Sequence, residues 1–173
     1  KEVRGMGNLD TVNARLLLVE DNPRAMDMLN RWLVRFGYQF LTEARSAAEA
    51  NQFISKEHFD VIVADMRMEA ADSAFTIIDE VRQRNISSVV IVFTANETWL
   101  DCRKAFRQRV CWDYISKNME GTNPYEELHN SIQEAISYFN RWGNRNDEVW
   151  IIENNTELLE KFRGQYIAVI NHT

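Results

Sequence analysis

The sequence has few of the residues that mark disulfide-bonded, metal-clustering or membrane proteins. Its two cysteines, Cys102 and Cys111, form neither a CxxC pair nor a metal-ligand pattern, so we interpret them as reduced thiols of a cytosolic protein. The three histidines also lack ligand spacing. No stretch approaches the about 18 apolar residues of a membrane span, and no signal-peptide pattern opens the chain. We therefore expect a cytoplasmic protein that binds no membrane.

The sequence also has no excess of positive charge. With 20 Lys and Arg against 26 Asp and Glu, its formal net charge is −6, whereas a dedicated nucleic-acid binder usually presents a basic surface. It contains no GxGxxG or Walker motif, and no histidine that would complete a hydrolase triad with Asp65 and a hydroxyl. We expect no direct contact with nucleic acid and no nucleotide site.

Short apolar runs alternate with amphipathic segments along most of the 173 residues. The expected strands are about 14–20, 38–41, 60–65, 89–94 and 112–116, and the expected helices cover about 23–36, 46–54, 75–81, 97–108 and 124–139. Such alternation predicts a parallel sheet with right-handed crossovers and helices on both faces.

Local signals support the ends of these elements. Asn22 followed by Pro23 is typical of an N-cap and a first helical position, and Gly37 supplies a left-handed stop. Ser46 and Glu49 have the spacing of a capping box.

Composition divides the chain into unequal parts. We expect a loose lead-in over 1–13, a main domain over 14–140, a polar hinge over 141–148, and a small α+β extension over 149–173. About thirty residues cannot bury a core of their own, so the extension should dock on the main domain, pair with another chain, or be the start of a longer module.

Four of the expected strands end at, or are followed directly by, residues with a carboxylate, hydroxyl or amine side chain. Glu20 and Asp21 follow the first strand, Asp65 the third, Thr94 ends the fourth, and Lys117 follows the fifth. Open α/β sheets bind ligands at the carboxyl ends of their strands, so we expect these groups to meet at one edge.

The residue types suit phosphoryl transfer to a carboxylate. Asp21 and Asp65 would bind Mg2+ directly, with Glu20 assisting through water, while Asp65 attacks phosphorus. Lys117 would pair with the phosphoryl oxygens, and the Thr94 hydroxyl would hydrogen-bond another.

Each residue taken alone also has a structural interpretation. Glu20 and Asp21 would favour a helix N-terminus through its dipole, and Asp65 would cap a loop. Thr94 with Glu97 has capping-box spacing, and Lys117 would be a solvated lysine. We favour the functional interpretation because all four features fall at successive strand ends.

These segments resemble the receiver domains of two-component response regulators. The resemblance covers about residues 15–140 and is carried by four runs: LLVEDN (17–22), DVIVADMRM (60–68), VFTA (92–95) and DYISK (113–117). It implies an α/β, flavodoxin-like fold: a three-layer, doubly wound sheet of five parallel strands in the order 2-1-3-4-5.

The resemblance also implies a function. Asp65 would accept a phosphoryl group from a sensor histidine kinase or a histidine phosphotransfer protein. Mg2+ would be held by Asp21, Asp65 and the backbone carbonyl of Arg67. Thr94 and Tyr114 occupy the switch positions, where hydroxyl and ring movements reshape the surface formed by the fourth helix, fifth strand and fifth helix. That surface would bind partners and allow homodimerisation.

Several positions depart from the family pattern. Glu69 and Asn118 stand where proline is usual, and Arg109, Val110 and Cys111 replace the expected turn of small residues before the fifth strand. Asn118 puts in doubt the cis peptide that normally shapes its loop. Under the family reading the chain is not an enzyme, and it catalyses at most its own phosphorylation and dephosphorylation.

Two alternatives remain. The chain could be a phosphorylation-independent interaction module that acts through its C-terminal extension. A haloacid-dehalogenase-like phosphohydrolase is disfavoured, because that family needs an Asp where Arg67 stands.

Overall fold

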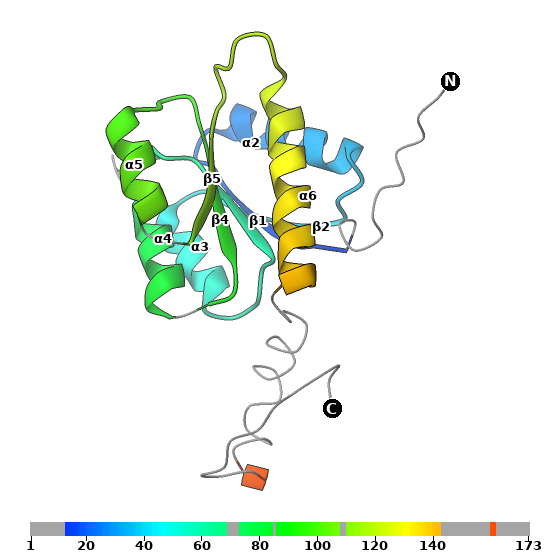
Figure 1. Cartoon of the computed structure of the whole chain (residues 1–173), viewed down its shortest axis with the longest axis vertical. Coiled ribbons are helices and arrows are strands. Elements are labelled where there is room, and N and C mark those ends of the chain that lie inside the picture. The colour runs from blue at the N-terminus through cyan, green and yellow to red at the C-terminus, as the bar shows by residue number, and fades with distance from the viewer. Residues whose placement is uncertain (1–12, 69–72, 85, 108–109, 143–159, 162–173) are drawn as a thin grey trace. The chain divides into compact units, whose positions relative to one another are not determined.

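The computed structural model describes residues 13–68, 73–84, 86–107, 110–142 and 160–161 (Figure 1). The chain divides into two compact units, Lys1–Ile136 and Ser137–Thr173. The expected lead-in, hinge and extension lie almost wholly outside the described residues, so their boundaries stay predictions. None of the described helices is both long and apolar enough to cross a lipid bilayer.

Strands and helices alternate through the described chain. The strands are β1 (Arg15–Val19), β2 (Phe40–Ala44), β3 (Val61–Ala64), β4 (Val89–Thr94) and β5 (Cys111–Ser116), and the helices are α2 (Pro23–Arg35), α3 (Ala47–Ile54), α4 (Ser73–Gln83), α5 (Trp99–Arg107) and α6 (Pro124–Trp142). The strands form one parallel sheet in the order β2-β1-β3-β4-β5. The predicted flavodoxin-like fold is confirmed.

The central strands are buried on both faces, as their unbroken apolar runs predict. All of β3 and β4 is buried. One face packs with α3, α4 and α5 into a cluster that includes Leu17, Ile62 and Ile78, and Figure 1 shows α2 and α6 on the other side of the sheet. This two-sided burial holds the strand ends rigidly, which is what a site built on them requires.

The predicted helix ends of α2 and α3 are confirmed. The Asn22 side chain accepts hydrogen bonds from the backbone amides of Arg24 and Ala25, and Gly37 ends α2 with a φ of 98°. The Ser46 hydroxyl accepts the Glu49 amide at 3.0 Å. Local sequence alone therefore fixes where these two helices begin.

One predicted strand boundary is wrong, and one structural alternative does not hold. The second strand was expected over 38–41, but β2 begins at Phe40, because Tyr38 follows the glycine turn and is buried instead, with its hydroxyl on His129. Thr94 and Glu97 do not form a capping box: the Thr94 hydroxyl accepts the Asn96 amide, and the first turn of α5 is capped by Thr98, whose hydroxyl accepts the Asp101 amide.

Candidate functional site

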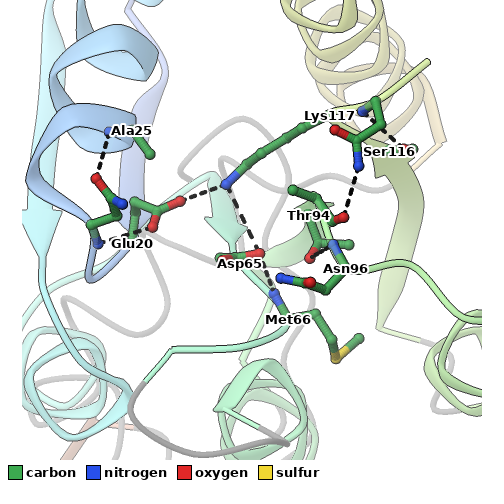
Figure 2. A network of polar contacts seen from close by, with 11 residues as sticks. Glu20, Ala25, Asp65, Met66, Thr94, Asn96, Ser116 and Lys117 are labelled. Carbon is green, nitrogen blue, oxygen red and sulfur yellow. Dashed lines mark hydrogen bonds and ion pairs between the residues drawn. The ribbon is translucent and has the colours of Figure 1, made fainter. Parts of the chain in front are cut away.

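The carboxyl ends of four strands meet at one edge of the sheet. In the register of the sheet Val19 lies beside Ala64, Ala64 beside Val92, and Thr94 beside Ser116. The residues that end or follow these strands are therefore neighbours, and Figure 2 shows Glu20, Asp65, Thr94 and Lys117 around one point.

A lysine joins two buried carboxylates at this edge. The Lys117 ammonium lies 2.5 Å from Oε2 of Glu20 and 3.9 Å from Oδ1 of Asp65 (Figure 2). Glu20 is 3% and Asp65 8% exposed. Because buried charges interact more strongly than charges in water, the Lys117 ammonium offsets part of the negative charge of these two carboxylates.

Backbone hydrogen bonds hold both acids in position. The Asp65 amide donates to the Val19 carbonyl at 2.9 Å, and the Asp65 carboxylate accepts the Met66 amide at 2.8 Å. The Glu20 carboxylate accepts the Asn22 amide at 3.0 Å. Oδ1 of Asp65 thus accepts a backbone hydrogen bond and also lies on the side of the carboxylate that faces Lys117.

The loops after β4 and β5 are bonded to each other. The Lys117 amide donates to the Thr94 carbonyl at 2.7 Å, and the Asn118 side-chain amide donates to the Ala95 carbonyl at 2.8 Å. The described residues contain no cis peptide bond. The residue that replaces the family's proline therefore connects the Lys117 loop to the Thr94 loop through its side chain.

Thr94 lies at the same edge, but within the described part of the chain its hydroxyl forms no hydrogen bond with Asp65. Its side chain is fully buried, and its hydroxyl accepts the Asn96 amide at 3.1 Å (Figure 2). A hydroxyl at this position can reorient toward a group added to Asp65, because its one hydrogen-bond partner among the described residues is a neutral backbone amide.

Asp21 and Arg67 lie at the margin of the site. Both are exposed, and the Arg67 guanidinium forms an ion pair with Asp101 of α5, at 3.3 Å. Among the described residues no group of three or more Asp, Glu, His or Cys side chains is arranged to hold a metal ion. The donor chemistry nevertheless fits Mg2+: the Glu20 and Asp65 carboxylates outnumber the one ammonium between them, and hard oxygens are the ligands this ion prefers.

Tyr114 lies on β5, and its ring packs against the core cluster beneath α5. Its hydroxyl is buried without a hydrogen-bond partner among the described residues. Burial raises the pKa of Tyr114 to about 12; the Thr98 backbone amide opposes this shift, and the negative charge of Asp101 adds to it. The phenol is thus neutral near pH 7.

Sequence reasoning missed three contacts of this site. It did not anticipate the Arg67–Asp101 ion pair, the bond from Asn118 to Ala95, or the cation–π contact of Lys117 with the Phe93 ring at 5.3 Å. Arg67 and Asp101 are 34 residues apart in the chain, and no periodic signal relates them. The replacement of proline by Asn118 was visible, but not the use made of its side chain.

Comparison with known proteins gives a family for this arrangement. Residues 16–133 match the response regulator receiver domain. Transcriptional regulatory protein GlrR of Escherichia coli (strain K12) is 28% identical over 130 residues, which are 75% of this chain and 29% of GlrR. Sensor histidine kinase RcsC of the same strain is 31% identical over 87 residues, 50% of this chain and 9% of RcsC. The chain spans less than a third of the length of either relative.

Solved structures show the same fold. A CheY-like response regulator receiver domain protein from Methanospirillum hungatei superposes with a TM-score of 0.65 at 21% identity, over 76% of this chain and 99% of that one. Response regulator protein TrrA from Thermotoga maritima, solved in complex with Mg(2+)-BeF, gives a TM-score of 0.59 at 21% identity, over 70% and 98%.

Proposed function

The chain belongs to the family of response regulator receiver domains, and from this premise we propose that it accepts a phosphoryl group on Asp65 and changes its binding surface in response. The observation that supports this proposal most strongly is the position of Lys117, whose ammonium lies 3.9 Å from the Asp65 carboxylate.

The transfer is an in-line displacement at phosphorus. An Asp65 carboxylate oxygen attacks, a new O–P bond forms, and the bond from phosphorus to the donor's nitrogen breaks, so that the donor histidine leaves with its electron pair and takes a proton. Lys117 would bind the oxygens of the transferred group and would give up its ion pair with Glu20. The Thr94 hydroxyl can bind another oxygen once it leaves the Asn96 amide.

Magnesium, when bound, would supply positive charge against the transferring group. The residues that would hold it are Glu20, Asp21, Asp65 and the backbone carbonyl of Arg67. Support comes from the charge of the site, where two buried carboxylates share one lysine, and from the Mg(2+)-BeF complex of the TrrA structure.

The response would reach partners through α5, β5 and α6. Thr94 and Tyr114 lie on neighbouring strands, β4 and β5, so a movement of the first toward the phosphoryl group makes room for the second. The donor would be a sensor histidine kinase or a histidine phosphotransfer protein, and the reshaped surface would bind partners, including a second copy of this chain.

Incubation with acetyl phosphate and Mg2+, followed by intact mass measurement, tests the proposal. We expect the wild type to gain one phosphoryl group and Asp65→Asn to gain none. Asp79→Asn is the matched control, because Asp79 lies on α4 in an i,i+3 ion pair with Arg82, away from the site, and it should react like the wild type.

The opposite result would favour a different function. If the wild type forms no adduct at any Mg2+ concentration, the phosphorylation-independent interaction module becomes the better account. If Asp65→Asn reacts as fully as the wild type, the acceptor is another residue.

A further inference from the structure

Asn118 uses two hydrogen-bond donors that a proline at its position would lack. Its side-chain nitrogen Nδ2 donates to the Ala95 carbonyl at 2.8 Å, and its backbone amide donates to the Ser116 hydroxyl at 3.0 Å. Because a carbonyl oxygen only accepts hydrogen bonds, the nitrogen of the side-chain amide must face Ala95. Proline has neither donor. The bond from Asn118 to Ala95, which we call the Asn118 bridge, is therefore specific to the residue that departs from the family pattern.

The Asn118 bridge joins the two loops that carry Thr94 and Lys117. Asn118 directly follows Lys117, and Ala95 directly follows Thr94. The Lys117 amide donates to the Thr94 carbonyl at 2.7 Å, and the Lys117 ammonium lies 5.3 Å from the centre of the Phe93 ring. Figure 2 shows Lys117 and Thr94 on adjoining segments at the edge of the sheet. The ends of β4 and β5 and the first residues after them thus form one connected unit.

Under the proposed function, both side chains of this unit change partners when the phosphoryl group arrives. The Lys117 ammonium now lies 2.5 Å from Glu20 and 3.9 Å from Asp65. The Thr94 hydroxyl now accepts the Asn96 amide at 3.1 Å. Both groups must reach oxygens of the same phosphoryl group, so the position of one backbone relative to the other decides whether they can bind it together.

We propose that Asn118 is a positioning residue for phosphoryl binding: the Asn118 bridge fixes the backbone of Lys117 relative to that of Thr94, so that the ammonium and the hydroxyl bind the phosphoryl group from a preformed arrangement. This inference rests on the proposed function. Asn118 does not bind the phosphoryl group itself, and it acts only through Lys117 and Thr94.

The exposure of the Asn118 bridge determines which property it affects. Ala95 and Asn118 are both exposed, and segments outside the core open more easily than the strands that they follow. Without the bridge, the two loops lose this restraint and must be ordered again when the phosphoryl group binds. Ordering that occurs during binding lowers affinity, whereas an arrangement formed beforehand avoids the loss. The bridge is therefore expected to act on the affinity for the phosphoryl group.

Beryllofluoride with Mg2+, a phosphoryl mimic, provides the test in the full chain, with its apparent affinity read by 19F NMR. Asn118→Leu keeps the size of the side chain but removes its donor, and we expect it to weaken binding about fivefold. Asn118→Gln keeps an amide donor and should recover part of the loss. Asn130→Leu is the matched control, because it makes the same change at an exposed position of α6. Equal affinities of Asn118→Leu and Asn130→Leu would overturn the inference.

A double-mutant cycle separates positioning from a merely structural effect. The relative position of hydroxyl and ammonium matters only while both are present, so Asn118→Leu should weaken beryllofluoride binding by less than about twofold in the Thr94→Ala background. Equal losses in both backgrounds would overturn the positioning role. If the wild type binds no beryllofluoride and gains no phosphoryl group, the proposed function fails together with this inference. If the wild type binds beryllofluoride and Asn118→Leu binds it equally well, only this inference fails.

Discussion

At the scale of single residues, the site holds two carboxylates, those of Glu20 and Asp65, but only one ammonium, that of Lys117. Its ammonium forms an ion pair with Glu20 and lies 3.9 Å from Asp65, and all three side chains are largely withdrawn from solvent. Removing one member of a buried ion pair is costly, because the remaining charge has no compensation. The site is therefore expected to depend on Lys117 for stability as well as for phosphoryl binding.

We expect Lys117→Met to lower the free energy of unfolding by about 2 kcal/mol, since two buried carboxylates then face each other alone. Adding Glu20→Gln should recover much of this loss by removing one of the two charges. Urea unfolding measures both effects. Lys56→Met, at an exposed lysine, is the control, and equal stabilities for Lys117→Met and Lys56→Met would contradict the argument.

Sequence reasoning identified the residue types of this site but not their pairing. Strand ends place Lys117 near Asp65 in any such sheet, yet its closer partner is Glu20. Both carboxylates are within reach of the same flexible side chain, so the choice depends on local geometry. The Arg67–Asp101 ion pair was invisible for a different reason, because both residues belong to loop and helix surfaces that carry no periodic signal.

At the scale of elements, an aromatic seam joins α2 to α6. The Trp32 ring stacks on Tyr125 at 5.5 Å between centroids, and Phe36 stacks on His129 at 4.3 Å. The Tyr38 hydroxyl lies 3.1 Å from Nδ1 of His129. Because these neighbours partly withdraw the His129 imidazole from water, its neutral form is favoured over its charged form.

This seam predicts a pH dependence of stability. Burial lowers the pKa of His129 below its ordinary value of 6.5, so between the folded and unfolded pKa values the unfolded chain binds more protons. The contribution of His129 is therefore complete above 6.5 and is lost as pH falls through its lower, folded pKa.

We expect His129→Gln to lose less stability than the wild type when pH falls from about 7.5 to about 5.5, a range above most carboxylate titrations. Urea unfolding midpoints at the two pH values provide the measurement. Identical pH responses of variant and wild type would show that the imidazole is not the sensitive group.

The edge strand shows where the prediction of elements was least accurate. The residues of β2 are exposed or half-buried except for Ala44. No alternation of apolar and polar residues therefore marks this strand, and the predicted strand began two residues early, at Tyr38. The Tyr38 side chain is buried because it contacts His129 on α6. This is a tertiary contact, which the local sequence does not reveal. The fully buried β3 and β4, by contrast, were evident from their apolar runs.

At the scale of the whole molecule, the fold followed from the alternation of strands and helices. Parallel strands connected by right-handed helical crossovers leave few topologies, and the runs around Glu20, Asp65, Thr94 and Lys117 then selected one strand order through the family resemblance. The observed order, β2-β1-β3-β4-β5, agrees. Contacts between elements, such as those of α5, could not be predicted in this way, because they depend on side-chain positions rather than on patterns.

Locating the acquired phosphoryl group tests the central claim most directly. Borohydride reduces an aspartyl phosphate to homoserine, so the full chain treated with acetyl phosphate and Mg2+, reduced, digested and sequenced by mass spectrometry should carry homoserine at position 65. Homoserine at another acidic residue, with Asp65 unchanged, would contradict the account.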